Sequence, residues 1–127
     1  MRILGFSTKD WINYHTGKPK LKQPVFTTFR LRRRDKDWQT GELVQVVFKP
    51  RSKNREPLGI AEIVKKEQRC LLCSSVRHCR RVVTSEAEQD GFSSLSDMET
   101  WLLKAHGSQV LEEPINKLLV RWVNGES

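Results

Sequence analysis

Residues 26–34 (FTTFRLRRR) constrain the fold of this chain more than any other stretch. Two sets of side chains alternate along it with the period of two that a β-strand requires. The first set is Phe26, Thr28, Arg30 and Arg32, and the second is Thr27, Phe29 and Leu31. We therefore predict a strand that contributes one face to a core and the other to a ligand site.

Alternating, β-branched segments bounded by turn residues predict the other strands. They are expected at residues 3–6, 43–48, 58–64 and 117–123, with one more within 69–83. The turn at residues 35–42 and the loop at residues 50–57 are expected to join three of these strands. Residues 18–24 carry two prolines and no periodicity, which predicts a mobile basic loop.

Three helices are predicted, two of them in the last third of the chain. The first is a brief helix through residues 10–14, with Ser7 or Thr8 as its N-cap, and the second spans residues 85–89. The third begins after Ser94 or Ser96 and ends at Gly107. It carries an apolar stripe that is expected to pack in the core: Leu95, Met98, Trp101 and Leu102.

The length and the order of these elements predict one domain over residues 1–127. Its class is α+β: a small, curved antiparallel β-barrel with two or three short helices. The N-terminal residues contain no apolar run that would make a signal peptide or a membrane span, so we expect a cytoplasmic protein with no membrane partner.

The formal net charge of +8 indicates an anionic partner, with nucleic acid as the leading candidate. The basic residues cluster before, within and after the strand at 26–34 and in the loop at 50–57. The candidate RNA-binding residues are Gly17, Lys18, Lys20, Lys22, Arg30, Arg32, Arg33, Arg34, Arg51, Lys53 and Arg55. Four aromatic residues could stack on bases, although two or three of them are expected in the core: Trp11, Tyr14, Phe26 and Trp38.

A possible zinc set is Cys70, Cys73, His78 and Cys79, because a C-x-x-C pair precedes a histidine and a third cysteine. A second well-spaced ligand pair is missing, and adjacent His78 and Cys79 are poorly placed to bind one ion. Thiols without a metal are therefore favoured, and no cofactor is expected.

Several ordered motifs together resemble the ASCH domain family. They are residues 12–18 (INYHTGK), Thr28-Phe29-Arg30, 38–44 (WQTGELV), 58–63 (LGIAEI), 87–92 (AEQDGF) and the helix at 95–103. The resemblance covers nearly the whole chain and implies a barrel like that of PUA RNA-binding domains. Relatives bind RNA or nucleotides, and some are enzymes, including an N-acetylcytidine amidohydrolase and a ribonuclease.

The resemblance also implies site residues. Thr28 and Arg30 occupy the threonine and arginine positions of the Thr-x-Arg signature of the family. Asp90 occupies the acidic position of the hydrolase pattern, where its side chain is one methylene shorter than the glutamate of that pattern. The lysine position, three residues before the threonine, falls at Val25. Valine cannot act as a base or a cation, so Lys18, Lys20 or Lys22 would have to supply the ammonium.

We therefore predict RNA or nucleotide binding in a basic cleft beside residues 26–34. Hydrolysis of an acylated cytidine or of RNA is the alternative, with Thr28 and Asp90 as its catalytic residues. A third possibility is a protein-interaction module whose basic face meets an acidic partner.

Overall fold

The strands form where buried and exposed side chains alternate in the sequence. In β5 (Leu43–Phe48), Val44 and Val46 are fully buried, whereas Leu43 is exposed and Gln45 is half-buried. This is the pattern of a strand with one face in the core, and it holds up to the register shift at Val46/Val47, where Val47 is buried as well. The computed structural model describes residues 1–8, 11–71 and 80–125.

The other elements follow in chain order. They are β1 (Arg2–Phe6), β2 (Ile12–Asn13), β3 (Lys18–Pro19), the 3-10 helix η1 (Lys20–Lys22), β4 (Val25–Leu31), β6 (Glu56–Cys70), β7 (Arg80–Arg81), α1 (Thr84–Asp90), α2 (Leu95–His106), α3 (Gln109–Glu112) and β8 (Ile115–Gly125).

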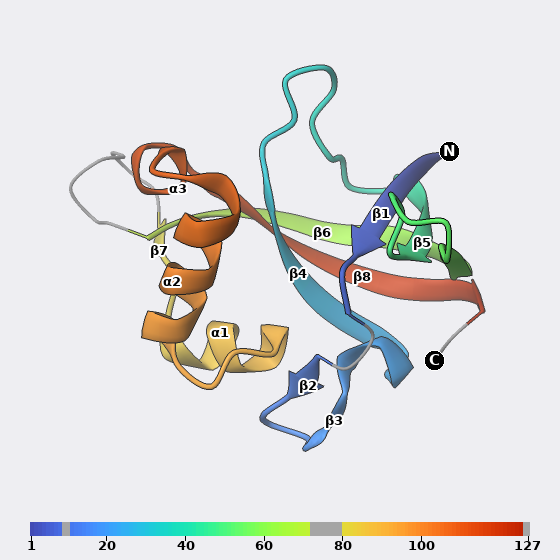
Figure 1. Cartoon of the computed structure of the whole chain (residues 1–127), viewed down its shortest axis with the longest axis horizontal. Coiled ribbons are helices and arrows are strands. Elements are labelled where there is room, and N and C mark those ends of the chain that lie inside the picture. Colours follow the sequence, from blue (N-terminus) through green and yellow to red (C-terminus); the bar gives the residue numbers. More distant parts are fainter. Residues whose placement is uncertain (9–10, 72–79, 126–127) are drawn as a thin grey trace.

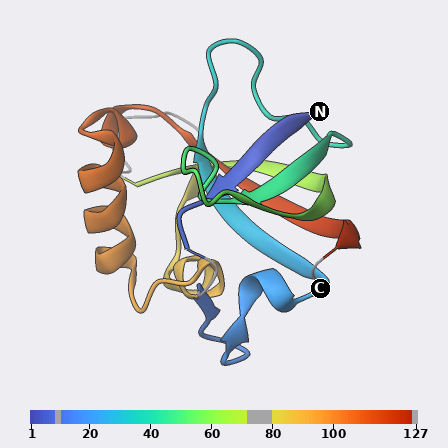
Figure 2. The same ribbon diagram turned by 45° about the vertical axis from the view of Figure 1, so that its right-hand side comes forward.

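The main sheet has the order β1-β5-β6-β8-β4 and curls into a half-barrel, with β7 paired to β6 (Figures 1 and 2). β6 pairs antiparallel with both β5 and β8, and its pairing shifts register at Ile60/Ala61 and at Ile63/Lys65. Such irregularities bend a strand and increase its twist, which lets the long β6 wrap around the core. Among the described residues, no strand pairing joins β1 to β4, so these two strands remain the open edges of the half-barrel.

Two apolar clusters fill the fold. The first lies inside the half-barrel and includes Leu4, Trp38 and Val120. The second lies between the sheet and the helices and includes Met98 and Leu102 of α2. The helices gather on one side of the sheet in both views, with α2 facing the open edge at β4 (Figure 2).

The structure confirms the predicted strands at 3–6, 26–32, 43–48, 58–64 and 117–123, although β6 and β8 are longer than expected. Two helices are also confirmed. The Ser94 hydroxyl accepts a hydrogen bond from Asp97 N at 3.0 Å, as an N-cap does, and α2 ends at Gly107. The four residues of α3 were not predicted.

Three predictions were wrong. Residues 11–14 form β2 and a turn, because the backbone N–H of Lys20 pairs with the Trp11 carbonyl across a hairpin. Within the predicted loop at residues 18–24, residues 18–22 form β3 and η1, because the side chain of Leu21 enters the core. The predicted antiparallel barrel is a half-barrel in the described part of the chain, and its sheet is mixed, since β1 pairs parallel with β5 and β7 with β6.

Candidate functional site

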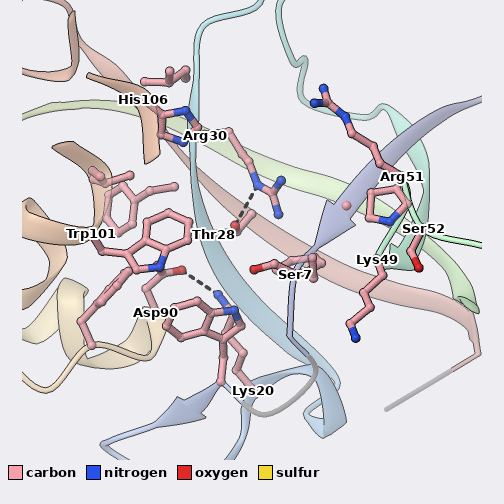
Figure 3. A pocket seen from close by; sticks show the side chains of 18 residues that line it. Ser7, Lys20, Thr28, Arg30, Lys49, Arg51, Ser52, Asp90, Trp101 and His106 are labelled. Atoms are coloured by element: carbon pink, nitrogen blue, oxygen red, sulfur yellow. Dashed lines mark hydrogen bonds and ion pairs between the residues drawn. The ribbon is translucent and has the colours of Figure 1, made fainter. Parts of the chain in front are cut away.

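A cavity of about 790 Å³ opens between β4, the end of β1 and α2. It lies at the gap between the two open edges of the half-barrel. Gly5 to Ser7 and the turn that follows β5 form one side, and residues of α2 form the other. Thr28 and Arg30 of β4 lie between these sides, where Figure 3 shows both side chains.

Lys20 enters this cavity from η1, at the end of the β2–β3 hairpin. The Trp122 indole Nε1 donates to the carbonyl of Leu21 at 3.1 Å, which ties η1 to β8. The Lys20 ammonium donates to Asp90 Oδ1 at 2.7 Å and to the Thr27 carbonyl at 2.9 Å, and the Lys20 side chain is only 3% exposed. Burial lowers the pKa of Lys20, against the opposing effect of the Asp90 carboxylate; the positive charge of Arg30 adds to the lowering.

Asp90 is the last residue of α1, and the conformation of Gly91 positions it. Gly91 has φ of +116° and its N–H donates to the carbonyls of Ala87 and Glu88, which ends the helix. A Cβ on Gly91 would lie 2.9 Å from Cε3 of Trp11. The close approach of Trp11 to the helix end therefore requires glycine at this position.

Thr28 and Arg30 form a second pair in the cavity wall. The Arg30 Nε donates to the Thr28 hydroxyl at 3.0 Å, and the guanidinium lies 4.6 Å from the centre of the Phe6 ring. Burial lowers the pKa of Arg30 to about 10, while Asp90 opposes this effect. Since 10 is far above neutral pH, Arg30 stays positively charged at the cavity.

Aromatic rings form the helix side of the cavity. The Trp11 ring lies 5.1 Å from Phe92 and 5.8 Å from Trp101, and Phe92 lies 5.9 Å from Trp101 (centroid distances). His106 packs on the Trp101 ring at 6.3 Å. Trp101 is 40% exposed although it belongs to the apolar stripe of α2, so the prediction that this residue is core was wrong. A planar ligand could stack against it.

Cationic groups form the opposite side. Lys49 and Arg51 follow β5, and Figure 3 shows them across the cavity from Trp101 and His106. Among the described residues, no carboxylate forms an ion pair with Arg30, Lys49 or Arg51. These three charges are therefore available to an anionic ligand.

The cavity brings together five residues of the predicted site: Lys20, Thr28, Arg30, Arg51 and Asp90. The remaining predicted basic residues do not line it. Gly17, Lys18 and Lys22 lie in or next to the β2–β3 hairpin, at the opposite end of β4 from the loop that carries Arg32, Arg33 and Arg34 (Figure 1). Arg33 pairs with Asp35 at 3.0 Å, and Lys53 and Arg55 are exposed on the loop between β5 and β6.

Lys49, Ser7 and His106 also line the cavity and were missed from the sequence. Lys49 has a weak signal, because it precedes the basic run at residues 51–55. Ser7 and His106 have none, since their neighbours at the cavity are distant in the chain. Of the four aromatic candidates for stacking, only Trp11 lines the cavity. Phe26 and Trp38 are buried in the core, which agrees with the prediction that two or three of the four would be core residues.

The zinc prediction falls largely outside the described residues, because Cys73, His78 and Cys79 belong to residues 72–79. Cys70 lies at the end of β6 and is 1% exposed. Across residues 1–8, 11–71 and 80–125, no helix has the length and apolar character needed to cross a bilayer.

Comparison of the chain with family models, with curated proteins and with solved structures finds no match. The resemblance to the ASCH family therefore stays a prediction.

Proposed function

We propose that this chain binds RNA or a nucleotide in the cavity between β4, β1 and α2. One observation carries the proposal: aromatic rings and three cations that form no ion pair with a described carboxylate line a single cavity, with Lys49 and Arg51 across from Trp101. Bases stack on aromatic side chains, and phosphates pair with arginine and lysine. A cavity of about 790 Å³ lies within the range of ligand pockets.

The overall charge supports the same partner. The net charge of +8 attracts polyanions, and binding that neutralises phosphates releases counterions. Affinity for RNA should therefore fall as salt concentration rises. An ASCH-like fold would agree with this function, but the proposal depends on the cavity and not on that resemblance.

A titration of fluorescently labelled single-stranded RNA at two salt concentrations tests the proposal. Trp101→Ala removes an aromatic wall and should weaken binding by about tenfold or more, because one stacked base is worth about 1–3 kcal/mol. Leu103→Ala is the matched control, since Leu103 lies on the same helix, is 37% exposed and does not line the cavity. Absence of binding, or equal losses in the two variants, would contradict the proposal.

Hydrolysis of an acylated nucleoside is a second candidate, and the position of Lys20 favours it. Although Val25 occupies the lysine position of the hydrolase pattern, the Lys20 ammonium reaches the cavity wall beside Thr28 and Asp90 from η1. Because the pKa of Lys20 is lowered, more of this side chain is in the neutral amine form, which is the form that can act as a general base. In such a reaction water adds to the acyl carbon, the carbon–nitrogen bond breaks, and the amine leaves with a proton.

Incubation with N-acetylcytidine tests this second candidate by the release of acetate and cytidine. Thr28→Val keeps the size and branching of the side chain but removes its hydroxyl, and should abolish turnover; Thr28→Ser should restore part of it. A wild-type protein that binds nucleotides without releasing acetate would exclude this reaction and leave the binding proposal intact.

A further inference from the structure

The turn at residues 49–52 is fixed against the end of β1. Lys49 N–H donates to the Phe6 carbonyl at 2.8 Å, and Ser52 N–H donates to the Lys49 carbonyl at 3.0 Å. Pro50 packs so closely on Gly5 that a Cβ added to Gly5 would lie 2.5 Å from Pro50 Cγ. The turn is therefore part of the cavity wall and does not project freely into solvent.

Lys49 holds an unfavourable backbone conformation in this turn. Its φ of 49° is the only positive value at a residue other than glycine among the described residues. The left-handed region costs an L-residue about 1–2 kcal/mol, and such strain persists where the surroundings fix it. The hydrogen bond to Phe6 and the contact between Pro50 and Gly5 provide that restraint, so the fold sets the direction in which the Cα–Cβ bond of Lys49 leaves the backbone.

Two cations and a hydroxyl line this side of the cavity, and a third cation lies between the two sides. Lys49 and Arg51 come from the turn, Arg30 comes from β4, and Ser7 follows β1; Figure 3 shows all four. No described residue provides a hydrogen-bond partner for the Ser7 hydroxyl. The aromatic rings lie at the opposite side, so the cavity is divided into an apolar half and a cationic half.

This division selects for a ligand with a planar ring at one end and an anion at the other. A phosphate monoester carries a charge of about −1.5 to −2 and three acceptor oxygens, which can engage several donors at once. A carboxylate offers only two oxygens and a single charge. The cationic half therefore matches phosphate better than carboxylate.

We propose that Lys49, Arg51 and Arg30, with the Ser7 hydroxyl, form a phosphate subsite, so that the ligand is a phosphorylated nucleoside and not a free nucleoside. This inference rests on the proposed binding function and narrows its ligand. The base lies against Trp101 and Trp11, and the phosphate lies at the turn.

Calorimetric titrations of the four nucleosides, their 5′- and 3′-monophosphates, and an RNA hexamer with and without a terminal phosphate test the subsite. At least one monophosphate should bind about tenfold more tightly than its nucleoside. Lys49→Gln and Arg51→Gln should each weaken monophosphate binding about fivefold and leave nucleoside binding unchanged. Lys53→Gln is the matched control, because it removes the same charge from the same loop at a residue that does not line the cavity.

The outcomes separate this inference from the proposed function. Equal affinity for nucleosides and monophosphates, or an equal loss in Lys53→Gln and Lys49→Gln, would overturn the phosphate subsite while base binding stands. Failure of every ligand to bind would overturn both. Higher affinity for a ligand with the phosphate than for the same ligand without it supports the subsite. If the phosphorylated hexamer binds more tightly than the monophosphates, the phosphate belongs to RNA. If a monophosphate binds more tightly than the hexamer, the ligand is a free nucleotide. Circular dichroism of each variant checks that the fold is retained.

Discussion

Asp90→Asn breaks the buried ion pair in the cavity wall without changing the size of the side chain. In the native protein the Lys20 and Asp90 side chains are 3% and 9% exposed, and their charged atoms lie 2.7 Å apart. The substitution leaves the Lys20 ammonium buried without its counterion. Removing one partner of a buried pair costs about 3–5 kcal/mol.

The structure places the expected loss near the lower end of that range. The Thr27 carbonyl still accepts a hydrogen bond from the Lys20 ammonium at 2.9 Å, and the asparagine carbonyl can accept another. We expect the free energy of unfolding to fall by about 3 kcal/mol at pH 7. Most molecules should remain folded, since domains are typically stable by about 5–15 kcal/mol.

The loss in the free energy of unfolding caused by Asp90→Asn should depend on pH, because the pKa of Lys20 is lowered in the folded state. Between this pKa and the unfolded value of 10.5 the folded protein binds fewer protons than the unfolded chain, so stability rises with pH. Asp90 opposes the lowering, and its removal therefore depresses the folded-state pKa of Lys20 further. The free energy of unfolding of Asp90→Asn therefore starts to rise at a lower pH than that of the native protein. The difference between the two free energies becomes smaller as the pH rises.

Urea unfolding followed by tryptophan fluorescence at pH 7 and at pH 9.5 measures this deficit. Glu88→Gln is the matched control. It also removes a negative charge from α1, but the ion pair that Glu88 forms with His15 is exposed to solvent. Its cost should stay below about 1 kcal/mol. If Asp90→Asn is no more costly than Glu88→Gln, or if its deficit does not narrow at pH 9.5, the ion pair does not stabilise the cavity wall as argued.

Three further substitutions test how the cavity is supported. Glu86→Gln weakens the contacts of a buried carboxylate with Arg69 at 3.0 Å and Lys117 at 2.7 Å, and should lower the free energy of urea unfolding by about 3 kcal/mol; an unchanged midpoint would contradict this. Gly5→Ala forces the 49–52 turn outward. The same variant should lose about 1–3 kcal/mol of unfolding free energy, measured by thermal unfolding, and should bind monophosphates more weakly. Gly91→Ala imposes an unfavourable φ at the end of α1 and should cost at least about 1–2 kcal/mol by the same assay, whereas a native melting temperature would show that the helix end can adjust.

Most strands and two helices could be predicted because their signals are local. The alternation of Leu118, Val120 and Trp122 with Leu119, Arg121 and Val123 agrees with the burial along β8. Ser94 and Gly107 marked the ends of α2 through backbone chemistry that involves only neighbouring residues. Such signals do not depend on the rest of the fold.

The segment before β4 shows where local signals fail. Two prolines and alternating lysines indicated a loose loop, yet Leu21 is 2% exposed and Lys20 is buried. The contacts that order this segment come from Trp122, which is 101 residues from Leu21 along the chain, and from Asp90, which is 70 residues from Lys20. A pattern within the segment cannot reveal partners at such separations.

The sequence by itself determined the positions of the principal strands, the excess of positive charge, and Thr28, Arg30 and Asp90 as candidate site residues. Only the tertiary structure decided that Lys20, and not Lys18 or Lys22, joins them, and that Lys49 faces the same cavity. The physical reason is that local backbone preferences set where a strand or helix begins. Burial and charge pairing between distant segments set which side chains meet.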